Sequence, residues 1–385
     1  MVLQSLCLEN NKIVYDILII GGGLAGLVNA IELSKAGLHV ALIEKQTYPF
    51  HRVCGEYISN ETLPYLQTLG FDPFAQGAVA LTEFRVSAPS GRSLRLPLDL
   101  GGFGLSRYTM DAVLSELAQK AGAHLYTGQK VLRVASLSEG FAAYTDQSPS
   151  PFRARVLIGA YGKRSHLDKD LQSDFFYKRS PYVGVKYHIR TSAHPEAQIA
   201  LHNFKQGYCG ISRIEAGKYC LCYLTTREQL RQYGNIAAME QAVLLQNPYL
   251  RHIWATSEFL YAKPLVINEV GFLPKSRVSQ GVLMCGDTTG MVAPLCGNGM
   301  AMAIHGAKVL ASLVKDFFAG TLSRAALEQE YQKAWQKRFA QRLWAGRNIQ
   351  HWFGHPRLTE ALVRSAQWMP RVAKVLMRQT HGPVF

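Results

Sequence analysis

Two short apolar runs near the start of the chain flank a segment with helical periodicity. Residues 15–20 (YDILII) and 38–43 (LHVALI) are rich in branched apolar side chains, which is typical of buried parallel strands. Between them, residues 21–26 (GGGLAG) lead into a helical pattern that continues to Lys35. The pattern predicts a strand–helix–strand unit with the acidic Glu44 at the end of its second strand.

The glycines of this unit have the spacing Gly-x-Gly-x-x-Gly, which is the fingerprint of a dinucleotide-binding turn. Gly21 allows a tight turn, Gly23 lets backbone N–H groups approach a pyrophosphate, and Gly26 lets helix and strand pack closely. The helix N-terminus brings partial positive charge to the phosphates, and Glu44 is placed to accept hydrogen bonds from a ribose. The unit predicts a bound NAD or FAD without deciding between them.

Shorter, alternating runs occupy the middle of the chain, between Phe175 and Leu273. They predict strands such as Tyr182–Ile189, Gln198–His202 and Lys218–Thr225. Within this region, Cys220 and Cys222 alternate with Leu221, which is typical of two thiols on one face of a strand.

The last 65 residues return to helical periodicity, with helices predicted over 324–350, 358–367 and 370–378. Tyr331, Trp335 and Phe339 recur every four residues, so we expect one apolar face that packs on the main body. This region carries 11 Lys and Arg against 3 acidic residues, more than half of the net charge of +15. Two interpretations stay open: a solvated helical face, or contact with an anionic membrane surface or an acidic carrier protein.

Composition limits the class of protein. The 385 residues are 48% apolar and 18% charged, which is typical of a globular chain with a sizeable core. No run of 18 apolar residues occurs, and the first residues lack the features of a signal peptide. The seven cysteines show no metal-binding spacing and the basic residues no nucleic-acid-binding motif. We therefore expect a cytoplasmic protein, with or without peripheral membrane contact, that holds no metal and binds no nucleic acid.

A second motif lies far from the first, and it decides the cofactor. Residues 281–287 (GVLMCGD) end in Gly-Asp and are followed by Pro294, Gly297-Asn-Gly299 and a helix from Met300. Here the sequence resembles the FAD-dependent oxidoreductases of the glutathione-reductase-like fold. The branch it resembles contains aromatic hydroxylases, geranylgeranyl reductases and flavin-dependent halogenases. The resemblance implies that Asp287 holds the ribityl chain of FAD, with Gly299 and Met300 beside the isoalloxazine ring.

Intermediate segments resemble the same branch. Residues 52–56 (RVCGE) are similar to the Lys/Arg-x-Cys-Gly segment of the reductases, and Arg107 with Asp111 is similar to the family's Arg-x-x-x-Asp helix. Residues 156–165 are similar to the Gly-Ala-Asp-Gly segment, except that Tyr161 replaces the aspartate. The FAD-binding residues implied are Gly21, Gly23, Ala25, Gly26, Glu44, Lys45, Arg52, Gly55, Arg107, Val131, Asp287, Gly299 and Met300.

The resemblance also implies an architecture. We expect an α/β fold with a Rossmann-type FAD-binding domain, an inserted and mostly antiparallel β-sheet that binds substrate, and a C-terminal helical segment. The predicted FAD-binding domain is discontinuous, over 1–75, 100–172 and 275–320. Residues 76–99 and 173–274 form the predicted substrate-binding domain, and 321–385 form the helical region.

The three activities of the branch differ in the motifs they need. Hydroxylases carry a histidine that is absent from Thr288-Thr289-Gly290, and the aspartate replaced by Tyr161 is often tied to NAD(P)H. No tryptophan of this chain lies in the Trp-x-Trp-x-Ile-Pro stretch of halogenases. The sequence therefore favours an oxidoreductase that transfers hydride to or from a C=C bond of an apolar lipid, isoprenoid or polyketide-like molecule. A monooxygenase using NAD(P)H and O2 is the alternative, and a non-catalytic flavin redox sensor is a third hypothesis.

Candidate catalytic residues follow from this reading. Reduction of a C=C bond needs a proton opposite the flavin, which Cys54 or Glu56 is placed to supply or orient. Tyr208 matches the tyrosine of a Tyr-x-Trp-x-Phe-Pro stretch found in geranylgeranyl reductases, whereas Gly210 stands where the tryptophan would be. That difference argues against a long prenyl substrate. The electron donor is expected to be NAD(P)H, a reduced ferredoxin or a reduced flavin.

Overall fold

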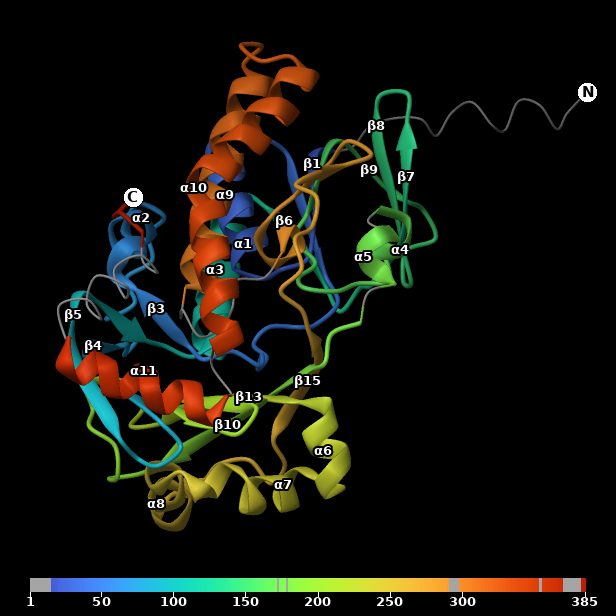
Figure 1. Cartoon of the computed structure of the whole chain (residues 1–385). Coiled ribbons are helices and arrows are strands. Elements are labelled where there is room, and N and C mark those ends of the chain that lie inside the picture. Colours follow the sequence, from blue (N-terminus) through green and yellow to red (C-terminus); the bar gives the residue numbers. More distant parts are fainter. Residues whose placement is uncertain (1–14, 172, 178, 291–297, 353–354, 370–381) are drawn as a thin grey trace, which may run out of the picture.

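Two β-sheets, one above the other in Figure 1, organise the chain. The computed structural model describes residues 15–171, 173–177, 179–290, 298–352, 355–369 and 382–385. The mixed α/β architecture predicted from the sequence is confirmed.

The first sheet contains the strand–helix–strand unit. Strand β1 (Tyr15–Ile20) pairs in parallel with β2 (Val40–Glu44) on one side and with β9 (Phe152–Gly159) on the other. Because β1 has neighbours on both edges and is covered on both faces, its side chains form a continuous apolar run rather than an alternating one. The remaining strands are β6 (His124–Thr127), β7 (Val131–Leu137), β8 (Gly140–Thr145), β16 (Val278–Ser279) and β17 (Val282–Met284).

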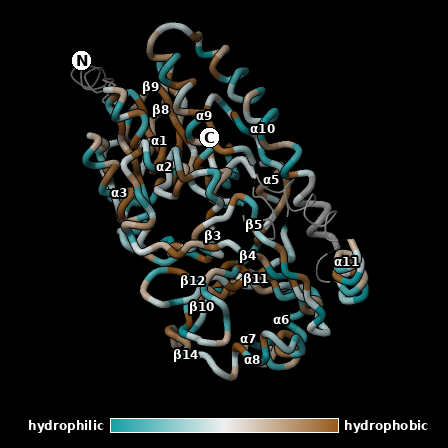
Figure 2. Tube along the Cα trace, turned by 90° about the vertical axis from the view of Figure 1, so that its left-hand side faces the viewer, coloured by the Kyte–Doolittle hydropathy of each residue, from teal (hydrophilic) through white to brown (hydrophobic). Residues whose placement is uncertain are grey.

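Helices pack against this sheet through its largest apolar cluster. Helix α1 (Leu24–Lys35) contacts both α3 (Arg107–Lys120) and α9 (Gly299–Phe318). Apolar colour gathers along α1, α9, β8 and β9 in Figure 2. The short elements nearby are η1 (Asn60–Thr62), α2 (Leu63–Thr68), α4 (Asp168–Leu171), α5 (Ser173–Phe176) and η3 (Gly286–Thr289).

The second sheet is mostly antiparallel, as the alternating pattern predicted. Its order is β14-β10-β13-β12-β11-β4-β5-β3, with β15 also paired to β10. Three strands come from the N-terminal part of the chain: β4 pairs in parallel with β11 and antiparallel with β5, and β5 pairs with β3. The strands are β3 (Tyr57–Ser59), β4 (Val79–Ser87), β5 (Ser93–Gly104), β10 (Tyr182–Arg190), β11 (Gln198–Phe204), β12 (Gly207–Arg213), β13 (Tyr219–Thr226), β14 (Glu258–Phe259) and β15 (Leu265–Val270).

A helical layer covers the outer face of the second sheet. Met239, Leu244 and Ile253 of this layer are buried against Tyr187 and Tyr223 of the strands. The opposite face of the second sheet is directed toward the first sheet (Figure 1). The elements of the helical layer are α6 (Arg227–Tyr233), α7 (Ile236–Ala242), η2 (Leu244–Gln246) and α8 (Pro248–Thr256).

The C-terminal region contains α10 (Arg324–Trp352) and α11 (Pro356–Trp368). The predicted apolar stripe is confirmed, because Tyr331, Trp335 and Phe339 are all buried in the first core. The predicted helix over 370–378, and Pro294 and Gly297 of the second motif, lie outside the described residues. Within the described residues, none of the helices is long and apolar enough to cross a membrane.

Candidate functional site

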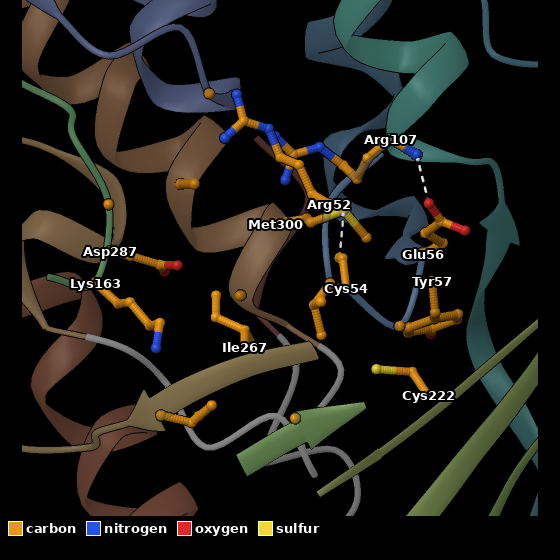
Figure 3. Close-up of a pocket in the computed structure, with 18 of the residues that line it drawn as sticks. Arg52, Cys54, Glu56, Tyr57, Arg107, Lys163, Cys222, Ile267, Asp287 and Met300 are labelled. Carbon is orange, nitrogen blue, oxygen red and sulfur yellow. Dashed lines mark hydrogen bonds between the residues drawn. The ribbon is translucent and has the colours of Figure 1, made fainter. Parts of the chain in front are cut away.

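A cavity of about 1310 Å³ lies between the two sheets. One end is lined by the glycine turn after β1, and the other by apolar residues of the second sheet and α11. Figure 3 shows Asp287 and Lys163 on one wall and Cys54 on the opposite wall, with Met300 next to Cys54. The cavity joins segments that are nearly 350 residues apart in the sequence.

The glycine turn has the geometry that its sequence predicted. Gly21 has a φ of 103°, a conformation that disfavours residues other than glycine. A Cβ on Gly26 would lie 2.0 Å from the carbonyl oxygen of Gly21, so only glycine permits this close packing. By contrast, a Cβ on Gly23 would approach only Arg107 Nη2, at 3.8 Å, because this position faces the cavity.

Two acidic side chains fix the arginines beside this turn. Glu44 Oε2 accepts a hydrogen bond from Gly22 N at 2.8 Å and lies 3.3 Å from Arg52 Nη2. Arg52 Nε and Arg107 Nε donate to the buried carboxylate of Asp111, at 2.9 and 2.7 Å. The arginines therefore border the cavity in fixed positions, with their charges only partly neutralised.

On the wall formed by Asp287 and Lys163, both side chains have a shifted pKa. Burial raises the pKa of Asp287, although the positive charge of Arg107 opposes this effect. Burial lowers the pKa of Lys163 to about 8. Lys163 follows Tyr161 in the segment that departs from the family pattern, and both side chains line the cavity.

The opposite wall is the RVCGE segment, which the second sheet holds from behind. Lys186 Nζ donates to the carbonyl of Arg52 at 3.0 Å, and Ser212 Oγ donates to that of Gly55 at 3.3 Å. Cys220 Sγ contacts the carbonyl oxygen of Cys54 at 3.2 Å. Three strands, β10, β12 and β13, thus position a short loop whose thiol lies 3.6 Å from the sulfur of Met300.

Glu56 is buried among donors. Its Oε1 lies 2.5 Å from Lys186 Nζ and 2.8 Å from Arg107 N, and its Oε2 lies 2.6 Å from His188 Nε2. Burial alone would raise the pKa of Glu56, but the charge of Lys186 and the hydrogen bond of His188 lower it to about 2. At neutral pH Glu56 is therefore a carboxylate that accepts hydrogen bonds.

Beyond Cys54 the cavity becomes apolar. Tyr208 and Gly210 of β12 face this part, and Tyr208 is 4% exposed. The rest of the apolar lining comes from β4, β5, β11, β13, β15, α11 and the residue after α11. It includes Phe84, Val86, Leu94, Leu96, Leu98, Ile199, Leu201, Leu224, Val266, Ile267, Leu362, Val363 and Met369.

The residues predicted from the sequence lie together. The structure places every predicted site residue except Gly26 in the lining of this cavity, and Gly26 instead packs against the turn. Their individual roles stay predictions. Sequence reasoning missed Lys163, Lys186 and His188, since no local motif marks them.

The cavity fits FAD. Gly23, Gly55 and Gly299 border the cavity, and a Cβ on Gly55 or Gly299 would meet no atom within 4 Å. The backbone is therefore open to a ligand at three separate points, between the N-terminus of α1 and the N-terminus of α9. The volume exceeds that of a usual small-molecule site, which leaves room for an elongated dinucleotide and a second molecule.

Comparison with known families gives two matches. Residues 14–204 match the family model described as FAD binding domain, and residues 260–342 match the one described as squalene epoxidase. FAD is therefore the cofactor of this chain, as the second motif predicted.

Individual relatives are distant. The chain is 23% identical to tryptophan 2-halogenase of Chondromyces crocatus, over 84% of this chain and 65% of the relative. It is 25% identical to digeranylgeranylglycerophospholipid reductase of Methanosarcina acetivorans, over 85% of this chain and 81% of the relative. Among solved structures, a geranylgeranyl bacteriochlorophyll reductase-like protein from Thermoplasma acidophilum has a TM-score of 0.75 at 20% identity, covering 91% of this chain and 90% of that one.

Proposed function

Because the chain belongs to the superfamily of FAD-dependent oxidoreductases that contains the geranylgeranyl reductases and flavin halogenases, we propose that it reduces a C=C bond of a long apolar molecule. The substrate class is an isoprenoid or another lipid. The observation that carries the proposal is the apolar half of the cavity, which extends from Cys54 between β4, β5, β12 and β15 to α11. This apolar half of the cavity, called the apolar slot below, is lined by strands and a helix far apart in the chain and suits a chain molecule better than a compact aromatic ring.

The absence of a side chain at Gly210 supports a broad slot. A Cβ on Gly210 would lie 3.5 Å from Leu201 Cδ2, which is ordinary contact, so larger side chains would extend into the cavity. In the sequence, the missing tryptophan argues against a long prenyl substrate. With Gly210 on the cavity wall, it equally favours a wider slot.

The roles of the chain's own residues follow from their positions. Bound FAD supplies the hydride, and the residues of this chain orient the substrate, exclude water and hold the proton. Burial raises the pKa of Cys54, so this side chain remains a protonated thiol at neutral pH. A neutral thiol that donates to the sulfur of Met300 presents an apolar surface against which the substrate packs.

The test is product analysis without oxygen. Protein loaded with FAD and reduced by dithionite is incubated in D2O with a geranylgeranyl lipid, and the product is analysed by mass spectrometry. We expect a product with two added hydrogens, one of them deuterium from the solvent. Recovery of unchanged lipid from reduced, FAD-loaded protein would contradict the proposal.

Oxygenation of the same substrate class is the second candidate, since residues 260–342 match the squalene epoxidase model. It is separated from reduction by repeating the incubation with NADPH and O2. A product that gains one oxygen atom, only in the presence of O2, would favour this second function over the first.

A further inference from the structure

A continuous row of hydrogen-bonding groups leads from the surface of the molecule to the cavity wall. His51 is exposed, and its Nδ1 lies 3.3 Å from the hydroxyl of Tyr261. The same hydroxyl lies 2.8 Å from His188 Nδ1. On the other side of that ring, His188 Nε2 lies 2.6 Å from Glu56 Oε2. Three side chains thus connect water with a carboxylate that is closed off from it.

The protonation states set the direction of these hydrogen bonds. Glu56 is ionised, so the proton of the 2.6 Å bond resides on His188 Nε2. When His188 Nδ1 carries no proton, it accepts the hydrogen bond of the Tyr261 hydroxyl. Burial raises the pKa of Tyr261, so its hydroxyl keeps its proton, and its oxygen accepts from His51 Nδ1. With these tautomers of His51 and His188, every donor points inward.

The rings are also held in place by their neighbours. His51 stacks on Tyr108 with centroids 4.6 Å apart, and the rings of His188 and Tyr261 lie 5.2 Å apart. On the far side of the carboxylate, Lys186 occupies the other oxygen of Glu56 at 2.5 Å. Because Lys186 and the backbone N–H of Arg107 occupy this oxygen, Oε2 is the oxygen that receives a proton from His188 and passes it to the substrate.

We propose that His51, Tyr261 and His188 form a proton relay that supplies the reaction in the cavity through Glu56. The inference rests on the proposed function, in which C=C reduction consumes one hydride and one proton. The hydride forms one new C–H bond and breaks the π bond, and the proton of the Glu56 carboxyl forms the second C–H bond. His188 Nε2 gives its proton to Glu56, His188 Nδ1 takes one from Tyr261, Tyr261 takes one from His51 Nδ1, and His51 Nε2 takes one from water. Before the next turnover, each ring returns to its starting tautomer and the Tyr261 hydroxyl turns back toward His188. The net uptake is one solvent proton.

The relay explains how Glu56, whose carboxyl has a low pKa, can donate a proton to the substrate. With its pKa held near 2, Glu56 keeps a proton only briefly, and it releases that proton readily. It therefore depends on a donor at hydrogen-bond distance in the same step, which is His188.

The test compares Tyr261→Phe with Tyr108→Phe. The first variant removes the hydroxyl that joins the two histidines, and the second removes a hydroxyl from the ring that stacks on His51. We expect Tyr261→Phe to lower kcat for lipid reduction about 100-fold, the low end of general acid–base effects, and to enlarge the solvent isotope effect. FAD affinity and reduction by dithionite should not change. Tyr108→Phe should retain kcat within about twofold of the wild type.

Two further measurements distinguish a relay from a structural role. In His51→Ala, which alters an exposed side chain, added imidazole should restore turnover, because it can bind where the ring was. In NMR spectra of the purified protein, the hydrogen-bonded N–H signal of His51 should disappear in Tyr261→Phe and persist in Tyr108→Phe.

The outcomes separate this proposal from the proposed function. Lipid reduction that proceeds unchanged in Tyr261→Phe would overturn the relay and leave the reductase intact. If wild-type protein reduces no lipid, the proposed function fails first, and the NMR comparison still shows whether the hydrogen-bonded row exists. Loss of turnover in His51→Ala without rescue by imidazole would also overturn the relay.

Discussion

Lys186 Nζ lies 2.5 Å from Glu56 Oε1, and neither side chain has any surface exposed to solvent. The pair joins β10 of the second sheet to the loop that carries Cys54, so it fixes one wall of the cavity. A buried ion pair is weak evidence for extra stability, but removing one of its two charges leaves the other buried without compensation and is strongly destabilising. This effect leads to a prediction.

Replacement of Lys186 by methionine should destabilise the protein by about 3–5 kcal/mol, because it leaves the carboxylate of Glu56 buried without its cation. The double variant Lys186→Met/Glu56→Gln removes both charges and should recover part of that loss. Urea unfolding of the two variants and the wild type measures the difference. Equal stability of Lys186→Met and the wild type would contradict a buried charge pair.

The same pair predicts how stability depends on pH. Folding lowers the pKa of Glu56 from 4.5 to about 2, so its contribution is complete above 4.5 and is lost as pH falls toward 2. Folding raises the pKa of Lys186, so its contribution is complete below 10.5 and declines only at higher pH. Unfolding free energy measured between pH 7 and 3 should fall more steeply for the wild type than for the double variant.

Two glycines of the turn should respond differently to alanine. Gly26→Ala places a methyl group 2.0 Å from the carbonyl oxygen of Gly21, so we expect about 1–3 kcal/mol or more of destabilisation. Gly23→Ala meets only Arg107 Nη2 at 3.8 Å, so folding should persist while FAD affinity falls by about tenfold or more. Thermal unfolding and FAD titration separate the two effects. Normal FAD affinity in Gly23→Ala would place the pyrophosphate elsewhere.

Cys54→Ala should retain FAD and slow lipid reduction, since the thiol beside Met300 is lost while the loop stays hydrogen-bonded. Cys222→Ala is the matched control, because Cys222 also lines the cavity and burial raises its thiol pKa to about 12. We expect the control to turn over substrate at nearly the wild-type rate. Unchanged turnover in Cys54→Ala would remove this thiol from the mechanism.

Gly210, which has no side chain, should determine how long a substrate the apolar slot accepts. Gly210→Ala adds a methyl group in ordinary contact and should be tolerated, whereas Gly210→Trp should fill the slot. We expect KM for a geranylgeranyl lipid to rise about tenfold or more in Gly210→Trp, with little change for a short prenyl compound. An equal response of long and short substrates would place the chain outside this part of the cavity.

The sequence was informative where local physics decides the structure. The glycine turn, the buried run of β1 and the stripe of Tyr331 and Trp335 are each specified by residues close together in the chain. The lining of one cavity by Gly21, Cys54 and Asp287 was predictable only because all three lie in motifs of one family.

Other parts of the site arise from contacts that no local pattern encodes. Lys186 and His188 lie on a strand that looks ordinary in sequence, and they meet Glu56 only because β10 packs behind the cavity loop. The apolar slot likewise combines β4 and β5 with α11, far along the chain. Charge pairing and cavity shape of this kind depend on tertiary packing, so they appear only in the structure.

In the proposed function, this flavoprotein delivers its electrons to a C=C bond rather than to oxygen. The most direct test mixes dithionite-reduced, FAD-loaded protein with a geranylgeranyl lipid under strict exclusion of oxygen and follows the visible spectrum. We predict that the spectrum of oxidised flavin returns at a rate that depends on lipid concentration, with one saturated bond formed per flavin. A flavin that remains reduced until oxygen is admitted, with an oxygenated product formed afterwards, would contradict the account.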